Sequence, residues 1–131
     1  MNFDSLFVNP KGRTSRSQFV PAALTLLAVI LFYAFLVKGR TATWCMLVLV
    51  FPAFVLHARR LHDMGHAAWM LLIPVVLMLA AFAIWLGLFS FGAQVDSILP
   101  LAALVISAAF TLWGAVGKGQ ADNRFGTPAV T

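Results

Sequence analysis

Hydrophobic and polar positions divide the chain into four long apolar runs joined by short polar segments. The runs cover residues 19–37, 41–58, 67–91 and 98–116, and they contain no Lys, Arg, Asp or Glu. About 20 helical residues cross a hydrocarbon core about 30 Å thick. Backbone polar groups in lipid must bond within their own segment, which selects helices here. The pattern predicts an all-α integral membrane protein, a four-helix bundle in one domain over residues 1–131.

Composition agrees with this class of protein. Hydrophobic residues make up 62% of the chain and the mean hydropathy is +0.94, whereas soluble domains have about 45–50% apolar residues. The first run is longer than a typical signal-peptide core, and no small-residue cleavage site follows it, so we expect it to be a retained span. The lone Cys45 excludes an internal disulfide.

The distribution of Lys and Arg predicts the orientation. Residues 1–18, the segment between the second and third runs, and the tail 117–131 would share one side of the membrane. That side carries Lys11, Arg13, Arg16, Arg59, Arg60, Lys118 and Arg124, against Lys38 and Arg40 on the other. The positive-inside rule then places both termini in the cytoplasm. Topology and anionic headgroups therefore explain the net charge of +5 without nucleic acid.

Local signals predict where helices begin and end and where they pack. Ser15 and Gln18 have the spacing of a capping box at the start of the first helix, and Gly65 is suited to end the second. A stripe of small residues in the fourth run predicts close helix packing, inside the monomer in preference to between copies. Its members are Ala103, Ser107, Thr111, Gly114 and Ala115.

Three polar motifs carry a family resemblance. They are GRTSRSQF at 12–19, RLHDMG at 60–65 with Trp69, and GKGQADNRFGTP at 117–128. In this order around four spans, they resemble the domain-of-unknown-function 805 family of small bacterial inner-membrane proteins. His66, Ala67 and Ala68 depart from the basic residue and Ser-Gly that such proteins often have there. The resemblance implies a bacterial inner-membrane location and a four-helix membrane domain, and it implies no activity.

The three motifs fall on the same predicted side of the membrane. In a bundle, their polar side chains can converge on one cytoplasmic patch at the helix ends. The candidate cluster comprises Arg13, Arg16, Arg60, His62, Asp63, Asn123 and Arg124.

Asp63 is the most informative member of this cluster. Its spacing from Arg59 allows a local surface ion pair. A carboxylate near a helix C-terminus is unfavourable, however, so we expect a further cation from elsewhere in the chain, namely Arg13, Arg16 or Arg124. The favoured interpretation is a structural staple that holds the helix ends together, and the alternative is a binding site.

Metal and cofactor sites are not predicted. His62 and His66 have the i, i+4 spacing of metal ligands, but Gly65 should end the helix between them and there is no cysteine cluster. His57 is expected to face either headgroups or the interior of the bundle. An interfacial imidazole could report pH, although two histidines do not establish a switch.

No enzyme motif stands out, and the basic residues are too dispersed for nucleic-acid binding. We therefore expect a multi-pass inner-membrane protein with a structural or binding role, without catalytic residues. Its partners would be the bilayer and an anionic headgroup, a small anion, a partner protein or a second copy of the chain. The alternatives are an enzyme acting on a lipid headgroup and an oligomeric pore or transport component.

Overall fold

The computed structural model describes residues 13–117 and 119, and no strand occurs in that part of the chain. Helices account for most of it. In chain order they are α2 (Arg16–Phe32), the π-helical turn η1 (Tyr33–Val37), α3 (Gly39–Val48), α4 (Val50–Asp63), the 3-10 turn η2 (Ala68–Leu71), α5 (Leu72–Trp85) and α6 (Ala93–Val116). The capping box predicted at Ser15 and Gln18 is present at the start of α2.

Four stretches of these helices are long and apolar enough to cross a membrane. They are Arg16–Val37, Gly39–Asp63, Ala68–Trp85 and Ala93–Val116. The prediction of an all-α membrane protein with four spans is therefore confirmed. The bounds differ most from the apolar runs at three places. The second span continues past residue 58 to Asp63, the third ends at Trp85 before residue 91, and the fourth begins at Ala93 before residue 98. At the second place, Gly87 and Gly92 adopt φ of 76° and 100°, which turns the chain after α5.

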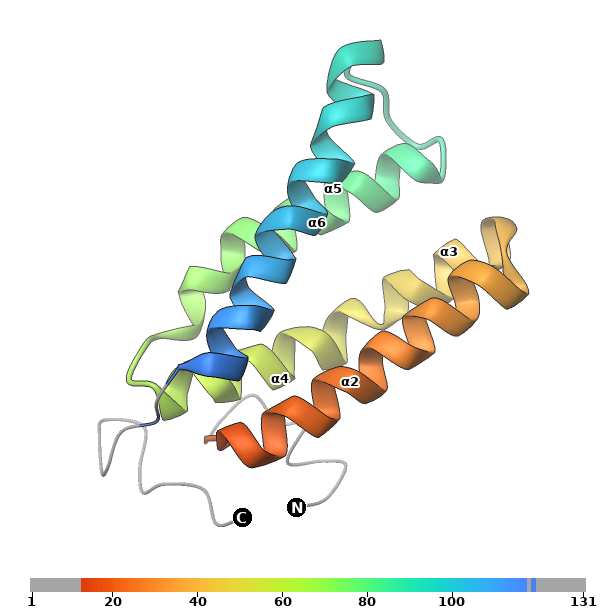
Figure 1. Cartoon of the computed structure of the whole chain (residues 1–131). Coiled ribbons are helices and arrows are strands. Elements are labelled where there is room, and N and C mark those ends of the chain that lie inside the picture. Colours follow the sequence, from red (N-terminus) through yellow and green to blue (C-terminus); the bar gives the residue numbers. More distant parts are fainter. Residues whose placement is uncertain (1–12, 118, 120–131) are drawn as a thin grey trace.

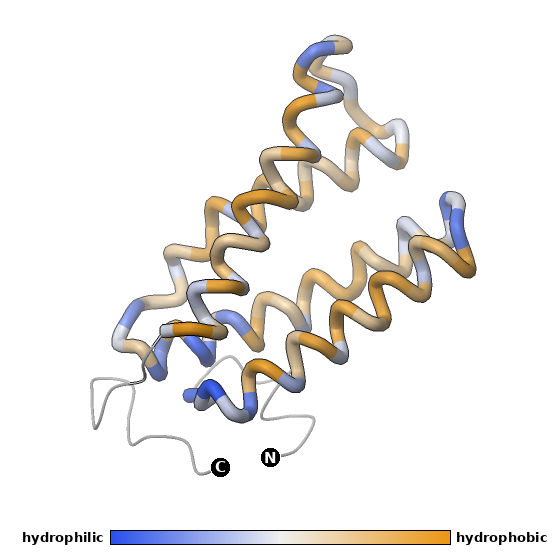
Figure 2. Tube along the Cα trace, in the orientation of Figure 1, coloured by the Kyte–Doolittle hydropathy of each residue, from blue (hydrophilic) through white to orange (hydrophobic). Residues whose placement is uncertain are grey.

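The helices form two antiparallel hairpins (Figure 1). The first consists of α2 and the α3–α4 pair, and the second of α5 and α6. The start of α2 and the ends of α4 and α6 lie together at one end, which we call the Asp63 end. The turns at Lys38 and at residues 86–92 lie at the opposite end, the Arg40 end, where α2 and α6 spread apart. Figure 2 shows hydrophobic residues along the helices and hydrophilic ones mainly at these two ends.

The second span is interrupted at Leu49, between α3 and α4. Pro52 has no backbone N–H, so it cannot bond to the carbonyl of Val48 as a helical residue would. Such a missing bond is a common cause of a break or bend in a membrane helix. The interruption lies in the half of the second span nearer to Lys38.

The hydrophobic core lies toward the Asp63 end. One cluster joins α2 to α4 through Phe19, Ala22, Leu26 and Leu56, with Ala115 of α6 packed against it. A second joins α4 to η2 through Ala58, Leu61, Met64 and Leu71, with Phe110 and Trp113 of α6 against it. The core thus surrounds the helix ends that carry the candidate site.

Candidate functional site

Asp63 is the last residue of α4, and the chain ends this helix in a well-defined way. Gly65 adopts φ of 87°. The N–H of His66 donates to the carbonyl of Leu61 at 2.8 Å, and the N–H of Gly65 donates to that of His62 at 3.1 Å. These two bonds form the Schellman motif, which a glycine at this position favours. Gly65 therefore ends the helix as predicted, and His62 and His66 do not share a face of one continuous helix.

The Asp63 carboxylate lies between two arginines, Arg60 from its own helix and Arg13 from a distant part of the sequence. The Nε of Arg13 donates to Oδ1 at 3.1 Å, and NH2 of Arg13 lies 2.9 Å from the same oxygen. NH1 of Arg60 lies 2.5 Å from Oδ2. The further cation that Asp63 requires is thus supplied by Arg13, from the segment that precedes α2.

Arg60 also bonds to three backbone carbonyls outside its own helix. Its Nε donates to Gly114 at 2.7 Å and its NH2 to Gly117 at 2.6 Å. Its NH1 donates to Thr14 at 3.4 Å. The last carbonyls of a helix lack partners within the helix and carry a partial negative charge. One guanidinium therefore joins the end of α4 to the end of α6 and to the start of the first hairpin.

Arg59 does not form the local ion pair with Asp63 that its spacing allowed; the ion pairs of that carboxylate are with Arg13 and Arg60. Its Nε donates to Oγ1 of Thr14 at 3.0 Å, and its NH2 donates to the carbonyl of Arg13 at 3.0 Å. The N–H of Thr14 returns a bond to the carbonyl of Arg59 at 3.1 Å. Arg59 thus fixes the segment that delivers Arg13 to Asp63.

These residues form a mostly buried polar group, which we call the Asp63 cluster: Arg13, Thr14, Arg59, Arg60 and Asp63. Arg60 is 1% exposed, Arg13 3% and Asp63 4%. Every buried side-chain N or O atom of the described residues has a hydrogen-bond partner. Buried charges are tolerated when they are paired and their remaining donors are bonded. The cluster meets both conditions.

Three glycines allow the end of α6 and the chain after it to approach this cluster. A Cβ on Gly114 would lie 2.9 Å from the ring of Phe19 and 3.2 Å from Cγ of Arg60. A Cβ on Gly117 would overlap Sδ of Met64, and one on Gly119 would overlap Oδ2 of Asp63. The small-residue stripe predicted close packing at Gly114, but the sequence analysis gave Gly117 and Gly119 no packing role. The recurrence of glycine at 114, 117 and 119 is the signal that could have indicated a close approach.

His57 lies inside the bundle, one turn before Arg60. Its Nδ1 lies 2.7 Å from the carbonyl of Ala53, and its Nε2 lies 2.8 Å from Oγ1 of Thr111. Its ring meets that of Phe19 edge-on at 5.3 Å between centroids. The hydroxyl of Thr111 also lies 3.0 Å from the carbonyl of Ser107, so its one proton bonds either to that carbonyl or to Nε2 of His57. The small-residue stripe of α6 therefore packs within the monomer at Thr111 and Gly114.

The other predicted members are arranged differently. Arg16 is exposed at the first position of α2, and His62 is half-buried in the last turn of α4. Asn123 and Arg124 lie outside the described residues. Within the described residues, no group of three or more His, Cys, Asp or Glu side chains could hold a metal ion.

Ion pairs and charged hydrogen bonds thus join the start of α2 to the ends of α4 and α6. This end carries the described residues of the first two polar motifs and Gly117 and Gly119 of the third. The chain belongs to the DUF805 family, described as "Protein of unknown function (DUF805)", whose model matches residues 7–127. No curated protein and no solved structure matches the chain.

Proposed function

We propose that this chain is a non-catalytic multi-pass protein of the bacterial inner membrane, with a structural and lipid-binding role. In this proposal, the Asp63 end and both termini face the cytoplasm. The Asp63 cluster holds the helix ends together, and the exposed Arg16 beside it contacts anionic headgroups. The observation that carries the proposal is the single carboxylate of Asp63 between the buried guanidinium groups of Arg13 and Arg60.

The bonding of the cluster supports a structural role. A general acid, base or nucleophile must reach a proton or atom of its substrate. Asp63 is 4% exposed and both of its oxygens are paired with arginines, while Arg60 uses its other donors on carbonyls. This geometry favours a fixed connection between helices over a reacting group.

The charge balance supports contact with anionic lipid. The described residues at the Asp63 end include the four arginines Arg13, Arg16, Arg59 and Arg60, but only one carboxylate, that of Asp63. Arg13 and Arg60 point inward. Arg16 is exposed, so it presents positive charge at the interface. Basic residues there attract anionic headgroups by about 1 kcal/mol each.

The lipid-binding part is tested by Arg16→Gln, with Lys38→Gln as the matched control at the Arg40 end. Both residues are exposed, and both changes remove one positive charge. Native mass spectrometry of the purified protein, supplied with mixed anionic and zwitterionic phospholipid, measures which lipid is retained. Arg16→Gln should lower the retained share of anionic lipid, while Lys38→Gln should leave it unchanged. The proposal would be contradicted if both variants retained the same share of anionic lipid. It would also be contradicted if Arg16→Gln released a co-purified protein and not lipid.

The orientation is tested separately in intact cells. Single cysteines in a Cys45→Ala background report which side of the membrane each position occupies. Positions 66 and 131 should resist a membrane-impermeant thiol reagent, and positions 38 and 94 should react with it. Labelling of position 131 from outside would reverse the proposed orientation without affecting the structural role of the Asp63 cluster.

A further inference from the structure

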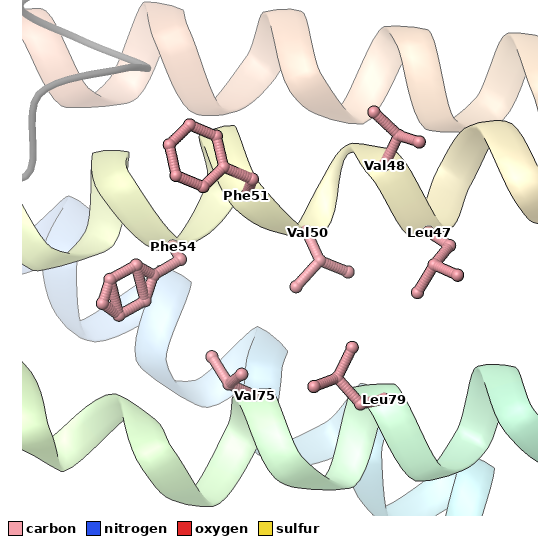
Figure 3. Close-up of a pocket in the computed structure, with 7 residues that line it drawn as sticks. All are labelled: Leu47, Val48, Val50, Phe51, Phe54, Val75 and Leu79. Atoms are coloured by element: carbon pink, nitrogen blue, oxygen red, sulfur yellow. The ribbon is translucent and has the colours of Figure 1, made fainter.

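An apolar opening lies between the first hairpin and α5, away from the Asp63 cluster. Its volume is about 530 Å³. Figure 3 shows that Leu47, Val50 and Phe54 line it from α3 and α4, and that Val75 and Leu79 line it from α5. All seven residues that form its walls are hydrophobic. The opening lies within stretches that can cross a membrane, where hydrocarbon is the surrounding solvent.

The opening coincides with the interruption of the second span. Val48 and Val50 flank the break at Leu49, and Phe51 follows directly. A regular helix through this region would continue the close packing seen nearer to Asp63. The opening is therefore lined by residues on both sides of the place where the second span departs from a regular helix.

Arg40 lies at one end of the two helices that line the opening, where α3 begins and α5 ends. NH2 of Arg40, in the first turn of α3, donates to the carbonyl of Leu86 at 2.7 Å, just after the end of α5. Arg40 is exposed, and this bond uses one of the five N–H donors of its guanidinium. Trp44 lies about one helical turn after Arg40 in α3, and Trp85 directly precedes Leu86 at the end of α5. Tryptophans are commonly enriched at the membrane–water interface.

We propose that this face binds one phospholipid, with its phosphate on Arg40 and an acyl chain in the apolar opening. The depth matches for the part of the opening nearer to Arg40: at 1.5 Å per helical residue, Leu47 lies about 10 Å from Arg40 along the helix and Val50 about 15 Å. One leaflet of hydrocarbon is about 15 Å deep, so a chain that begins at Arg40 reaches along the opening. A guanidinium binds phosphate through charge-assisted bonds.

A second copy of this chain fits the opening less well. A helix is about 10 Å across, so its entry would require α3 and α5 to separate along the whole length of the opening. An acyl chain is narrower and needs no such movement. The proposed site is at the opposite end from the headgroup contact proposed for Arg16, and it does not depend on that proposal.

The first test uses the full chain in lipid nanodiscs that contain a phospholipid with a photoreactive group in its acyl chain. Mass spectrometry of peptides then locates the adducts. Residues 47–54 and 75–79 should be labelled several-fold more than residues 101–105, because Leu101, Leu104 and Val105 form an exposed apolar face of α6 without an opening. Equal labelling of the two regions, or protein–protein crosslinks across the opening, would overturn the proposal.

Variants then separate the two halves of the site. Val50→Trp should fill the opening, and Leu104→Trp is the matched control on the α6 face. Arg40→Gln removes the phosphate contact, and its loss should weaken retention of the lipid about tenfold, as expected for one hydrogen bond to a charged group. In native mass spectrometry, Val50→Trp and Arg40→Gln should lose the retained lipid, and Leu104→Trp should keep it. Unchanged retention in both site variants, with helix content intact by circular dichroism, would refute the site.

Discussion

The two ends of this molecule use the same residue type in contrasting ways. At the Asp63 end, Arg60 bonds to the carbonyls of Gly114 and Gly117 at the end of α6. At the Arg40 end, Arg40 bonds to the carbonyl of Leu86 at the end of α5. Both arginines thus satisfy carbonyls left free at a helix C-terminus. Only Arg60 is buried and paired with a carboxylate; Arg40 is exposed.

This difference in burial predicts how strongly each arginine stabilises the contact between the helices that it joins. A buried charge loses its hydration, so it depends entirely on its partners. An exposed one can exchange a protein partner for water or a headgroup at little cost. The apolar clusters around Phe19 and Leu61 also lie near the Asp63 end. We therefore expect the hairpins to be held firmly at the Asp63 end and to separate more readily at the Arg40 end.

The largest expected effect comes from Asp63→Asn. The substitution leaves the guanidinium groups of Arg13 and Arg60 buried without a counter-charge, a change that lowers the free energy of unfolding by about 3–5 kcal/mol. Thermal unfolding in detergent measures it, at low and at high salt. Asp96→Asn is the control, since Asp96 bonds to Ser90 and Phe91 on the exposed surface of the Arg40 end. If Asp63→Asn melts like the parent, the structural role of the cluster is wrong.

The second prediction exchanges the two arginines for lysine. Lysine keeps the charge but has no planar fork, so it cannot make the separate bonds that Arg60 makes to Asp63, Gly114 and Gly117. Arg60→Lys should lower the free energy of unfolding by about 2–3 kcal/mol, as several charged hydrogen bonds are lost. Arg40→Lys loses one exposed bond and should cost less than about 1 kcal/mol. Equal melting of the two variants would remove the distinction between the ends.

The third prediction concerns the glycine that lies against the carboxylate. A Cβ on Gly119 would overlap Oδ2 of Asp63, and the carboxylate cannot move aside because two arginines hold it. Gly119→Ala should therefore lower the free energy of unfolding by about 1–3 kcal/mol, the usual range for overpacking. In an Asp63→Ala background the effect should disappear, since the overlap is gone. A double-mutant cycle of thermal unfolding measures this coupling, and additive effects would contradict the contact.

Much of the fold could be predicted from the sequence, because its signals are local. The absence of charge from the four runs indicates spans, and Ser15 and Gly65 mark helix ends by their own chemistry. The need of Asp63 for another cation also followed from its place near a helix C-terminus. These inferences depend on a residue and its immediate neighbours in the chain.

The pairings across the bundle could not be predicted in this way. Arg13 was one of three candidates for Asp63, and only the path of the chain before α2 selects it. The bonds of Arg59 to Thr14, and of His57 to Thr111, depend on how α2, α4 and α6 pack. The apolar opening was not foreseen either, since no local signal in the second apolar run indicates that Pro52 accompanies a break at Leu49. Its effect depends on the position of α5 beside the break.

The smallest expected effect is a gain in stability at the Arg40 end. Lys38 adopts φ of 62° and ψ of 168° between η1 and α3, a conformation almost restricted to glycine that costs other residues about 1–3 kcal/mol. Lys38→Gly should remove this strain, although glycine adds about 0.5–1 kcal/mol of conformational freedom to the unfolded chain. The net gain should be about 1 kcal/mol, measured as a higher melting temperature in detergent.

Lys38→Ala is the control, because it removes the same charge and keeps the strained conformation; it should not stabilise the protein. A gain in both variants would assign the effect to charge. A gain in Lys38→Gly alone would show that the turn at the Arg40 end is strained, whereas the Asp63 end owes its order to buried bonds.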